Sequence, residues 1–133
     1  MIYLLDTYTF IWAALSPGNL SKHCKKIIVD KNNEICVSTV SLWEMSLKTQ
    51  LKKFAFEGIN IEDFPQYARD MEFSIIDMQE KEAVQCHALP LKENHQDPFE
   101  RMLIWQAVSR GMIMISKNKL FAQYKKDGLK LIW

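Results

Sequence analysis

The chain has 133 residues, of which 48% are hydrophobic, and its 17 basic and 16 acidic side chains give a net charge of +1. This composition supports a packed core and excludes a disordered chain. The balanced charge argues against a surface that is basic throughout, although it permits a local basic patch. Three widely spaced cysteines without a CxxC pair argue against a disulfide framework or a zinc site and favour a reducing, cytoplasmic environment. We expect a single domain over residues 1–133 with no signal peptide and no membrane span, because no apolar run approaches the ~20 residues that a span needs.

Short apolar runs alternate with helical patterns along the chain. Runs at 2–5, 35–38, 73–76 and 112–116 predict strands, and a run at 129–132 is a fifth candidate that would close the sheet. Helical patterns cover 9–15, 21–31, 41–53, 61–71, 77–89 and 97–110, while 54–60 and 90–96 are typical of loops. The runs are continuous, as in parallel strands covered on both faces. The alternation predicts a three-layer α/β/α domain around a mostly parallel sheet of four to five strands.

Acidic or amide side chains stand where predicted strands give way to helices or loops. Asp6 directly follows the first strand, Glu44 comes shortly after the second, Asp97 and Glu100 open the helix at 97–110, and Asn118 follows the fourth strand. In an open α/β sheet, the chemistry collects at the carboxyl ends of the strands. Carboxylates gathered there repel one another, and a bound divalent cation is the usual reason to tolerate them. The spacing therefore predicts a metal site.

Each of these residues also has a structural interpretation. Asp6 suits a helix N-cap or a turn, and Asn118 suits a turn. The segment from Ser41 to Glu44 has the form of a capping box, in which a glutamate reaches back to the amide of the cap residue. We interpret Asp97 as the cap of its helix and Glu100 as the better candidate ligand.

Other candidates carry weaker signals. His95 has no ligand-like spacing to another histidine or to a cysteine, and we interpret it as a loop residue. The four tryptophans lie in apolar contexts and favour the core or a dimer interface over a base-stacking platform.

Five segments resemble a known family. They are LLDTYTFIW at 4–12, VSTVSLWEMSLK at 37–48, HQDPFERMLIWQA at 95–107, MISKNKLFAQY at 114–124 and the closing GLKLIW. In this order they resemble the PIN-domain superfamily and, within it, the VapC-type toxins of type II toxin–antitoxin pairs. The resemblance implies a Rossmann-like sheet, ribonuclease activity that depends on Mg²⁺ or Mn²⁺, homodimerisation and inhibition by a small cognate antitoxin.

The resemblance also implies roles for individual residues. Asp6 and Glu44 match the first and second acids of the family. The third belongs to the DPFER segment, where Glu100 replaces the commoner aspartate and Asp97 is its neighbour. The fourth acid normally stands at the position of Asn118, so one negative charge is lost here. We expect weaker metal binding, and weakened or absent catalysis is the alternative that this position leaves open.

The mechanism that we expect uses these side chains around one Mg²⁺, held by Asp6, Glu44, Glu100 and Asn118. A water of lowered pKa on the ion would attack an RNA phosphodiester in line. Candidate substrate contacts near the acids are Thr7, Lys48, Arg101 and Lys117. Solvated positions on a helix or loop are an equally good interpretation of the three basic residues.

Two other classes compete with a metal-dependent ribonuclease toxin. The first is a PIN-like module that has lost catalysis and acts by binding RNA or an antitoxin, which Asn118 supports. The second is a receiver-like, phosphate-binding α/β domain, and the aspartate pair that this class needs is missing. A dinucleotide-binding enzyme ranks lower still, because the chain lacks a glycine-rich strand–helix turn.

Overall fold

A computed structural model describes the whole chain, residues 1–133. Its strands form a single sheet in the order β3-β2-β1-β4-β5, and every neighbouring pair is parallel. The strands are β1 (Ile2–Leu5), β2 (Glu34–Ser38), β3 (Ser74–Ile76), β4 (Ile113–Ile115) and β5 (Lys130–Ile132). The predicted strands and the parallel sheet are confirmed, including the fifth strand, because continuous apolar runs mark strands that are covered on both faces.

Helical segments connect these strands. The α-helices are α1 (Thr7–Leu15), α2 (Lys22–Val29), α3 (Thr39–Gln50), α4 (Phe64–Asp70), α5 (Glu80–Gln85) and α6 (Pro98–Arg110). Tighter 3-10 turns form η1 (Pro17–Asn19), η2 (Ile61–Asp63), η3 (Cys86–Ala88) and η4 (Lys119–Asp127). None of the helices has the length and apolar character that a membrane crossing needs.

Three predictions about helices need correction. The helix expected at 41–53 begins earlier, at Thr39, because the Ser38 hydroxyl caps it by accepting the N–H of Val40 at 3.1 Å. The helix expected at 77–89 is divided into the short α5 and η3. Residues 119–127, for which no helix was predicted, form η4, and Phe121 and Tyr124 anchor it in the core.

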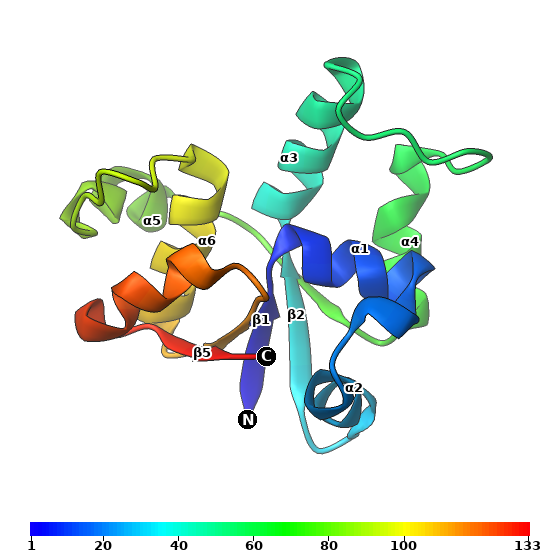
Figure 1. Cartoon of the computed structure of the whole chain (residues 1–133), viewed down its shortest axis with the longest axis horizontal. Helices are drawn as coiled ribbons and strands as arrows, with labels where there is room; N and C mark the ends of the chain where they lie inside the picture. Colours follow the sequence, from blue (N-terminus) through cyan, green and yellow to red (C-terminus); the bar gives the residue numbers. More distant parts are fainter.

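The sheet separates two apolar clusters, which makes the domain three-layered. Leu5 of β1 packs on one face in a cluster that includes Phe10 and Phe64. The next residue towards the N-terminus, Leu4, packs on the other face in a cluster that includes Leu103. Figure 1 shows α1, α2 and α4 on one side of the strands and α5, α6 and η4 on the other. The alternating side chains of the central strand therefore hold both helical layers on the sheet.

The strand order reverses beside β1. The chain runs from β1 outwards to β2 and β3, then returns to place β4 on the other side of β1. The Asp6 N–H donates to the Ile115 carbonyl at 3.2 Å, so the carboxyl ends of β1 and β4 lie side by side. In open α/β sheets, ligands bind outside the sheet at such a reversal.

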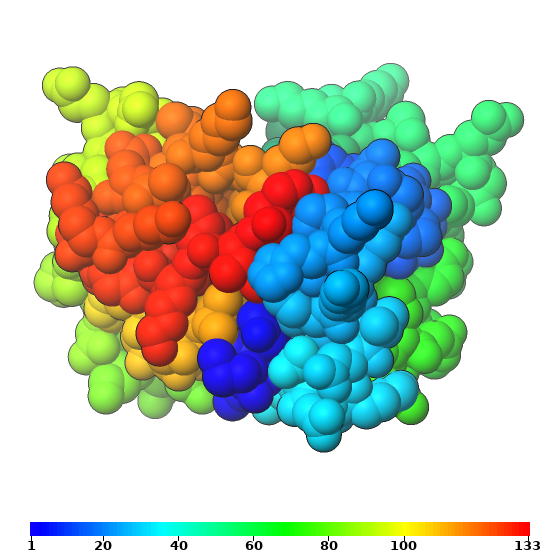
Figure 2. Space-filling view, turned by 60° about the horizontal axis from the view of Figure 1, so that its bottom comes forward, coloured from blue at the N-terminus to red at the C-terminus, as the bar shows by residue number.

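The C-terminal residues lie beside α1, near the ends of β1 and β4. The space-filling view in Figure 2 shows the last residues (red) lying between the α1 region (blue) and the η4 region (orange). The ring of Trp133 meets that of Trp12 in α1 at a centroid distance of 5.8 Å. The final strand therefore helps to fix α1, which follows Asp6 directly.

Candidate functional site

A cavity opens at the reversal between β1 and β4. Its volume is about 480 Å³. It is lined by side chains from the ends of both strands and from α1, α6 and η4, namely Asp6, Tyr8, Trp12, Glu100, Lys117, Asn118 and Lys119. The structure thus brings four of the predicted site residues to one hollow, namely Asp6, Glu100, Lys117 and Asn118, with a second lysine and two aromatic rings beside them.

Asp6 is both a helix cap and a member of this cavity. Its Oδ1 accepts the N–H of Thr9 at 2.9 Å, and its Oδ2 accepts the hydroxyl of Ser116 at 2.5 Å. Burial raises the pKa of Asp6, the hydrogen bonds from Ser116 and Thr9 lower it only in part, and the charge of Glu44 raises it further. The two interpretations of Asp6 coexist because its two oxygens have different partners.

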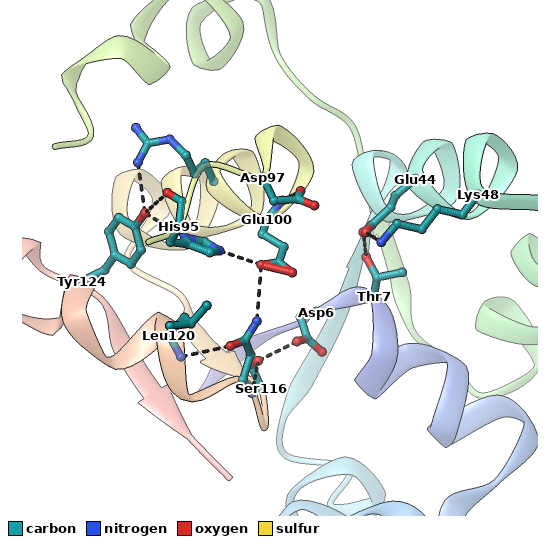
Figure 3. A network of polar contacts seen from close by, with 12 residues as sticks. Asp6, Thr7, Glu44, Lys48, His95, Asp97, Glu100, Ser116, Leu120 and Tyr124 are labelled. Atoms are coloured by element: carbon teal, nitrogen blue, oxygen red, sulfur yellow. Dashed lines mark hydrogen bonds and ion pairs between the residues drawn. The ribbon is translucent and has the colours of Figure 1, made fainter. Parts of the chain in front are cut away.

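Glu44 lies deeper in its helix than the sequence suggested. Because α3 is capped by Ser38, the capping box predicted from Ser41 to Glu44 is wrong, and Glu44 belongs to the second helical turn. Its carboxylate accepts the hydroxyl of Thr7 at 2.5 Å and pairs with Lys48 one turn further along. Figure 3 shows Glu44 beside Thr7 and Lys48, apart from both Asp6 and Glu100. Thr7 therefore orients a site acid.

Asp97 caps α6 as expected, and Glu100 follows it in the first turn of the helix. The Asp97 side chain caps the helix by accepting the N–H of Glu100 at 3.0 Å. The carboxylate of Glu100 points into the cavity towards Asp6 (Figure 3). Burial raises the pKa of Glu100, the hydrogen bond with His95 opposes this rise, and the charge of Asp97 raises the pKa again.

Asn118 turns its amide nitrogen towards the acids. Its Oδ1 accepts the N–H of Leu120 at 3.0 Å, which caps η4 and fixes which end of the amide is the oxygen. Its Nδ2 then donates to Glu100 Oε2 at 3.3 Å. In this placement Asn118 stabilises the Glu100 carboxylate instead of offering an oxygen to a cation.

His95 is a site residue that the sequence analysis undervalued. It lies in a loop, as expected, but it is buried at 4% exposure. Its Nε2 is 2.6 Å from Glu100 Oε2, and its Nδ1 is 2.8 Å from the hydroxyl of Tyr124. Tyr124 comes from η4, which the sequence analysis did not predict, so no local pattern around His95 indicated this contact.

The predicted phosphate contacts separate into two groups. Lys117 lines the cavity, and Lys48 lies at the site but is paired with Glu44. Desolvation alone lowers the pKa of Lys48, but the hydrogen bond and charge of Glu44 outweigh it and raise the pKa. Lys119, which the sequence analysis did not single out, joins Lys117 on the wall of the cavity.

The structure gives Arg101 a different role from the phosphate contact that we expected. Its guanidinium is buried, and it donates to the carbonyls of Leu89 and Pro90 at 2.8 and 3.0 Å and to the Tyr124 hydroxyl at 3.0 Å. These contacts tie the loop before α6 to η4. Arg101 therefore supports the loop that carries His95 and has no free donor directed at the cavity.

The acids are not placed as a ready set of metal ligands. No three histidine, cysteine, aspartate or glutamate side chains of residues 1–133 stand close enough to bind one ion together. Asp6 and Glu100 nevertheless face one cavity, and burial disfavours the charged form of both. Their oxygens are the hard donors that Mg²⁺ prefers, so the donor chemistry of these two residues fits a divalent cation. Glu44 is engaged with Lys48 and would join them only after leaving that lysine.

Comparisons with known proteins agree with this arrangement. Residues 3–127 match the model of the PIN domain. The chain therefore belongs to the PIN-domain family, whose members are generally nucleases. No curated protein matches the chain.

Solved structures share the fold across the whole chain. VapBC2 from Rickettsia felis, bound to a DNA fragment from its promoter, is 19% identical with a TM-score of 0.67, and the match covers 99% of this chain and 98% of that one. DNA-bound VapBC from Salmonella typhimurium is 16% identical with a TM-score of 0.65, covering 99% and 97%. VapBC-1 from nontypeable Haemophilus influenzae is 18% identical with a TM-score of 0.61, covering 99% and 97%. At these identities the likeness establishes the fold.

Proposed function

We propose that this protein is a divalent-metal-dependent endoribonuclease. The observation that carries the proposal is the meeting of the buried Asp6 and the half-buried Glu100, two carboxylates with raised pKa values, in one cavity at the strand reversal of a PIN domain. Lys117 and Lys119 lie on the wall of the same cavity and supply positive charge for a phosphate backbone. Acidic and basic groups in one hollow suit a phosphodiester that must be bound and also activated.

Mg²⁺ or Mn²⁺ is the proposed cofactor. Asp6 and Glu100 would hold it, with Glu44 as a third acid and Asn118 at the edge of the set. Such an ion supplies a water of lowered pKa and stabilises charge that develops on the phosphate.

The chain's own residues prepare this site. Ser116 fixes the Oδ2 of Asp6, His95 fixes Glu100, and Thr7 fixes Glu44. Asp97 acts indirectly, because its cap sets where the first turn of α6 places Glu100. Preorganised ligands of this kind lower the cost of assembling the site when the substrate arrives.

The experiment that tests this function is cleavage of a mixed RNA pool by the purified protein with Mg²⁺, Mn²⁺ or EDTA. We expect cleavage that needs the metal and disappears in Asp6→Asn. The asparagine can still cap α1, so the loss would report the carboxylate and not the fold. Cleavage that continues in EDTA, or in Asp6→Asn at the native rate, would contradict the proposal.

A second candidate is a PIN module whose catalysis has weakened and which acts by binding RNA or an antitoxin. The observation that favours it is the orientation of Asn118, whose oxygen is used by the backbone of η4 and whose amide faces Glu100. Asn118→Asp separates the two candidates in the same cleavage assay. An inactive native chain with an active Asn118→Asp variant would favour the binding module.

We also propose that the protein is the VapC-type toxin of a toxin–antitoxin pair and is inhibited by a cognate antitoxin in the cytoplasm. The support comes from the motifs in the sequence and from fold neighbours that are VapBC proteins. Co-expression with the product of a small neighbouring reading frame tests this. We expect the two chains to purify together and the cleavage to be suppressed, whereas separate elution with full activity would contradict it.

A homodimer is the proposed assembly. Trp43 is 61% exposed on α3, and its ring meets that of Phe99 edge-on at 4.9 Å. The two rings border an apolar hollow of about 260 Å³ that also includes Met78 and Met102. Large exposed apolar groups of this kind mark interaction surfaces. Sedimentation should show a dimer for the native protein and a smaller species for Trp43→Ser. A Trp43→Ser variant that remains a dimer would contradict this choice of face.

A further inference from the structure

We propose that Tyr8 and Trp12 of α1 form a stacking subsite for one unpaired base of single-stranded RNA, next to the proposed cleavage site. This inference rests on the proposed nuclease and specifies its substrate class. Both rings line the cavity that contains Asp6 and Glu100. Trp12 packs on the core, which is one of the two places that the sequence analysis expected, and it also lines the cavity.

Tyr8 has the exposure that a stacking residue needs. Its side chain is 45% exposed, whereas its neighbours Thr7 and Thr9 are 3% and 0% exposed. The first turn of α1 therefore presents one aromatic ring to solvent beside Asp6. A ring beside a phosphodiester-cleaving site can meet a base of the strand being cut, because every base offers a π-face.

The Tyr8 ring is also held in place. Phe54 meets it edge-on at a centroid distance of 5.7 Å, and Trp12 lies at 6.0 Å with an interplanar angle of 42°. A ring fixed by its neighbours loses little conformational freedom when a base stacks on it. The aromatic wall is thus organised before the substrate arrives.

Positive charge surrounds the same rings. Lys117 Nζ lies 6.0 Å from the centre of the Trp12 ring, and Lys48 Nζ lies 5.8 Å from that of Tyr8. Lys119 completes the cavity wall. A phosphate beside a stacked base would meet Lys117 or Lys119, whereas Lys48 is paired with Glu44. Stacking platforms combined with basic grooves are the usual way of binding single strands.

The cavity therefore combines three kinds of chemistry that a nucleotide requires. The carboxylates can hold a cation beside the scissile phosphate, the aromatic rings can stack on the base, and the lysines of the same wall can meet the backbone. A volume of about 480 Å³ lies within the range of small-molecule sites. A base inside a duplex is already stacked and paired, so this arrangement selects unpaired nucleotides.

The test is a binding measurement with abasic RNA. Fluorescein-labelled single-stranded octamers, each lacking the base at one position, are titrated by anisotropy in EDTA so that no strand is cut. We expect one position at which removal of the base weakens binding to the native protein by about 5- to 150-fold, the range of one base–aromatic stack. Tyr8→Ala should bind the intact octamer more weakly and lose this penalty, whereas Tyr8→Phe should keep both the affinity and the penalty.

Controls make each outcome decisive. Leu91→Ala, which removes an exposed apolar side chain outside the cavity, should behave like the native protein. Three outcomes would overturn the subsite. The penalty could persist in Tyr8→Ala, the native protein and Tyr8→Ala could bind intact RNA equally, or the native protein could bind duplex RNA as tightly as single strands. The readout does not depend on cleavage. Binding through Tyr8 without cleavage in Mg²⁺ would reject the nuclease alone, and cleavage without a base penalty would reject the subsite alone.

Discussion

Two sets of carboxylates in this protein differ in how the rest of the fold compensates their negative charge: Glu82 on one side, and Asp6 with Glu100 on the other. Glu82 of α5 receives both Nε and Nη2 of Arg110, at 2.6 and 2.8 Å, and also the side-chain amide of Gln106 at 3.1 Å. Burial alone raises the pKa of Glu82, but these hydrogen bonds and that from the Gln79 backbone outweigh it and lower the pKa to about 2. This carboxylate is fully compensated within the fold.

Asp6 is buried and Glu100 is half-buried, and neither has an arginine or lysine partner. Ser116 and Thr9 donate to Asp6, while Glu100 is contacted by the Asn118 amide and by the His95 ring. Burial raises the pKa of both acids, and the neighbouring charge of Glu44 adds to the rise. The comparison teaches that a buried acid with its own arginine stabilises the fold, whereas carboxylates without an arginine or lysine partner retain a need for positive charge that a bound cation can meet.

The largest expected effect is a difference in RNA cleavage between a variant of Asp6 and a variant of Glu82. Asp6→Asn should lower RNA cleavage by more than about 100-fold, because even the partners that orient metal ligands are worth 10- to 100-fold. Its free energy of unfolding should stay equal or rise, since a charge that burial disfavours is removed and the helix cap is kept. Glu82→Gln is the matched control and should cleave RNA at the native rate when it is folded. Equal losses of activity in both variants would break the comparison.

The next effect concerns stability. Glu82→Gln should lower the free energy of unfolding by about 2 kcal/mol, because Arg110 loses its charged partner but still reaches a backbone carbonyl and solvent. Urea unfolding at neutral pH measures this difference. A variant as stable as the native protein would show that the Glu82–Arg110 pair contributes nothing net.

The same pair predicts a pH dependence. The pKa of Glu82 is lowered from 4.5 to about 2 in the folded protein, so its stabilisation is present above pH 4.5 and is lost as the pH falls towards 2. The stability difference between the native protein and Glu82→Gln should therefore shrink over this interval. A difference that stays constant from neutral pH to pH 2 would contradict the assignment.

A smaller effect is expected at His95. His95→Ala removes the ring that contacts Glu100 and leaves the Tyr124 hydroxyl with Arg101 and the backbone carbonyl of residue 95 as partners. We expect a loss of about 10-fold in cleavage and in apparent Mn²⁺ affinity, as for other residues that orient metal ligands. Tyr124→Phe is the control, because it disturbs the same buried network without touching Glu100. A variant with lowered stability but native metal affinity would make His95 purely structural.

The smallest effect is expected from Asn118→Asp. The change replaces a donor to Glu100 by a third negative charge at the cavity, so it should bind Mn²⁺ about threefold to tenfold more tightly and unfold more easily without metal. Thermal unfolding with and without Mn²⁺ measures both effects. A metal response identical to that of the native protein would show that position 118 lies outside the cation site.

The sequence predicted the sheet better than it predicted the site. All the strands were found from their apolar runs, because burial on both faces leaves a continuous local signal. The cap at Asp97 was found for a similar reason, since its signal is local: Asp97, Pro98 and Glu100 lie within four consecutive positions. Asp6 and Glu100 were placed in one site only from the general rule that ligands bind at the carboxyl ends of strands, which says nothing about the distance between the two side chains.

The errors arose where distant segments decide the structure. The start of α3 was misplaced because two serines, Ser38 and Ser41, both suit a cap, and only Ser38 is followed by the helix. Arg101 was taken for a phosphate contact because its partners, the Leu89 carbonyl and Tyr124, are remote in sequence. His95 was undervalued for the same reason, since its second contact lies 29 residues away.

The central claim is that Asp6 and Glu100 form a cation site and Glu82 does not. Equilibrium binding of Mn²⁺, followed by the electron paramagnetic resonance signal of the free ion, tests it most directly in four proteins: the native chain, Asp6→Asn, Glu100→Gln and Glu82→Gln. We predict saturable binding by the native chain and by Glu82→Gln, with a loss of at least about 10-fold in affinity in the other two. Equal Mn²⁺ affinity in all four proteins, or no saturable binding to the native chain, would contradict the account.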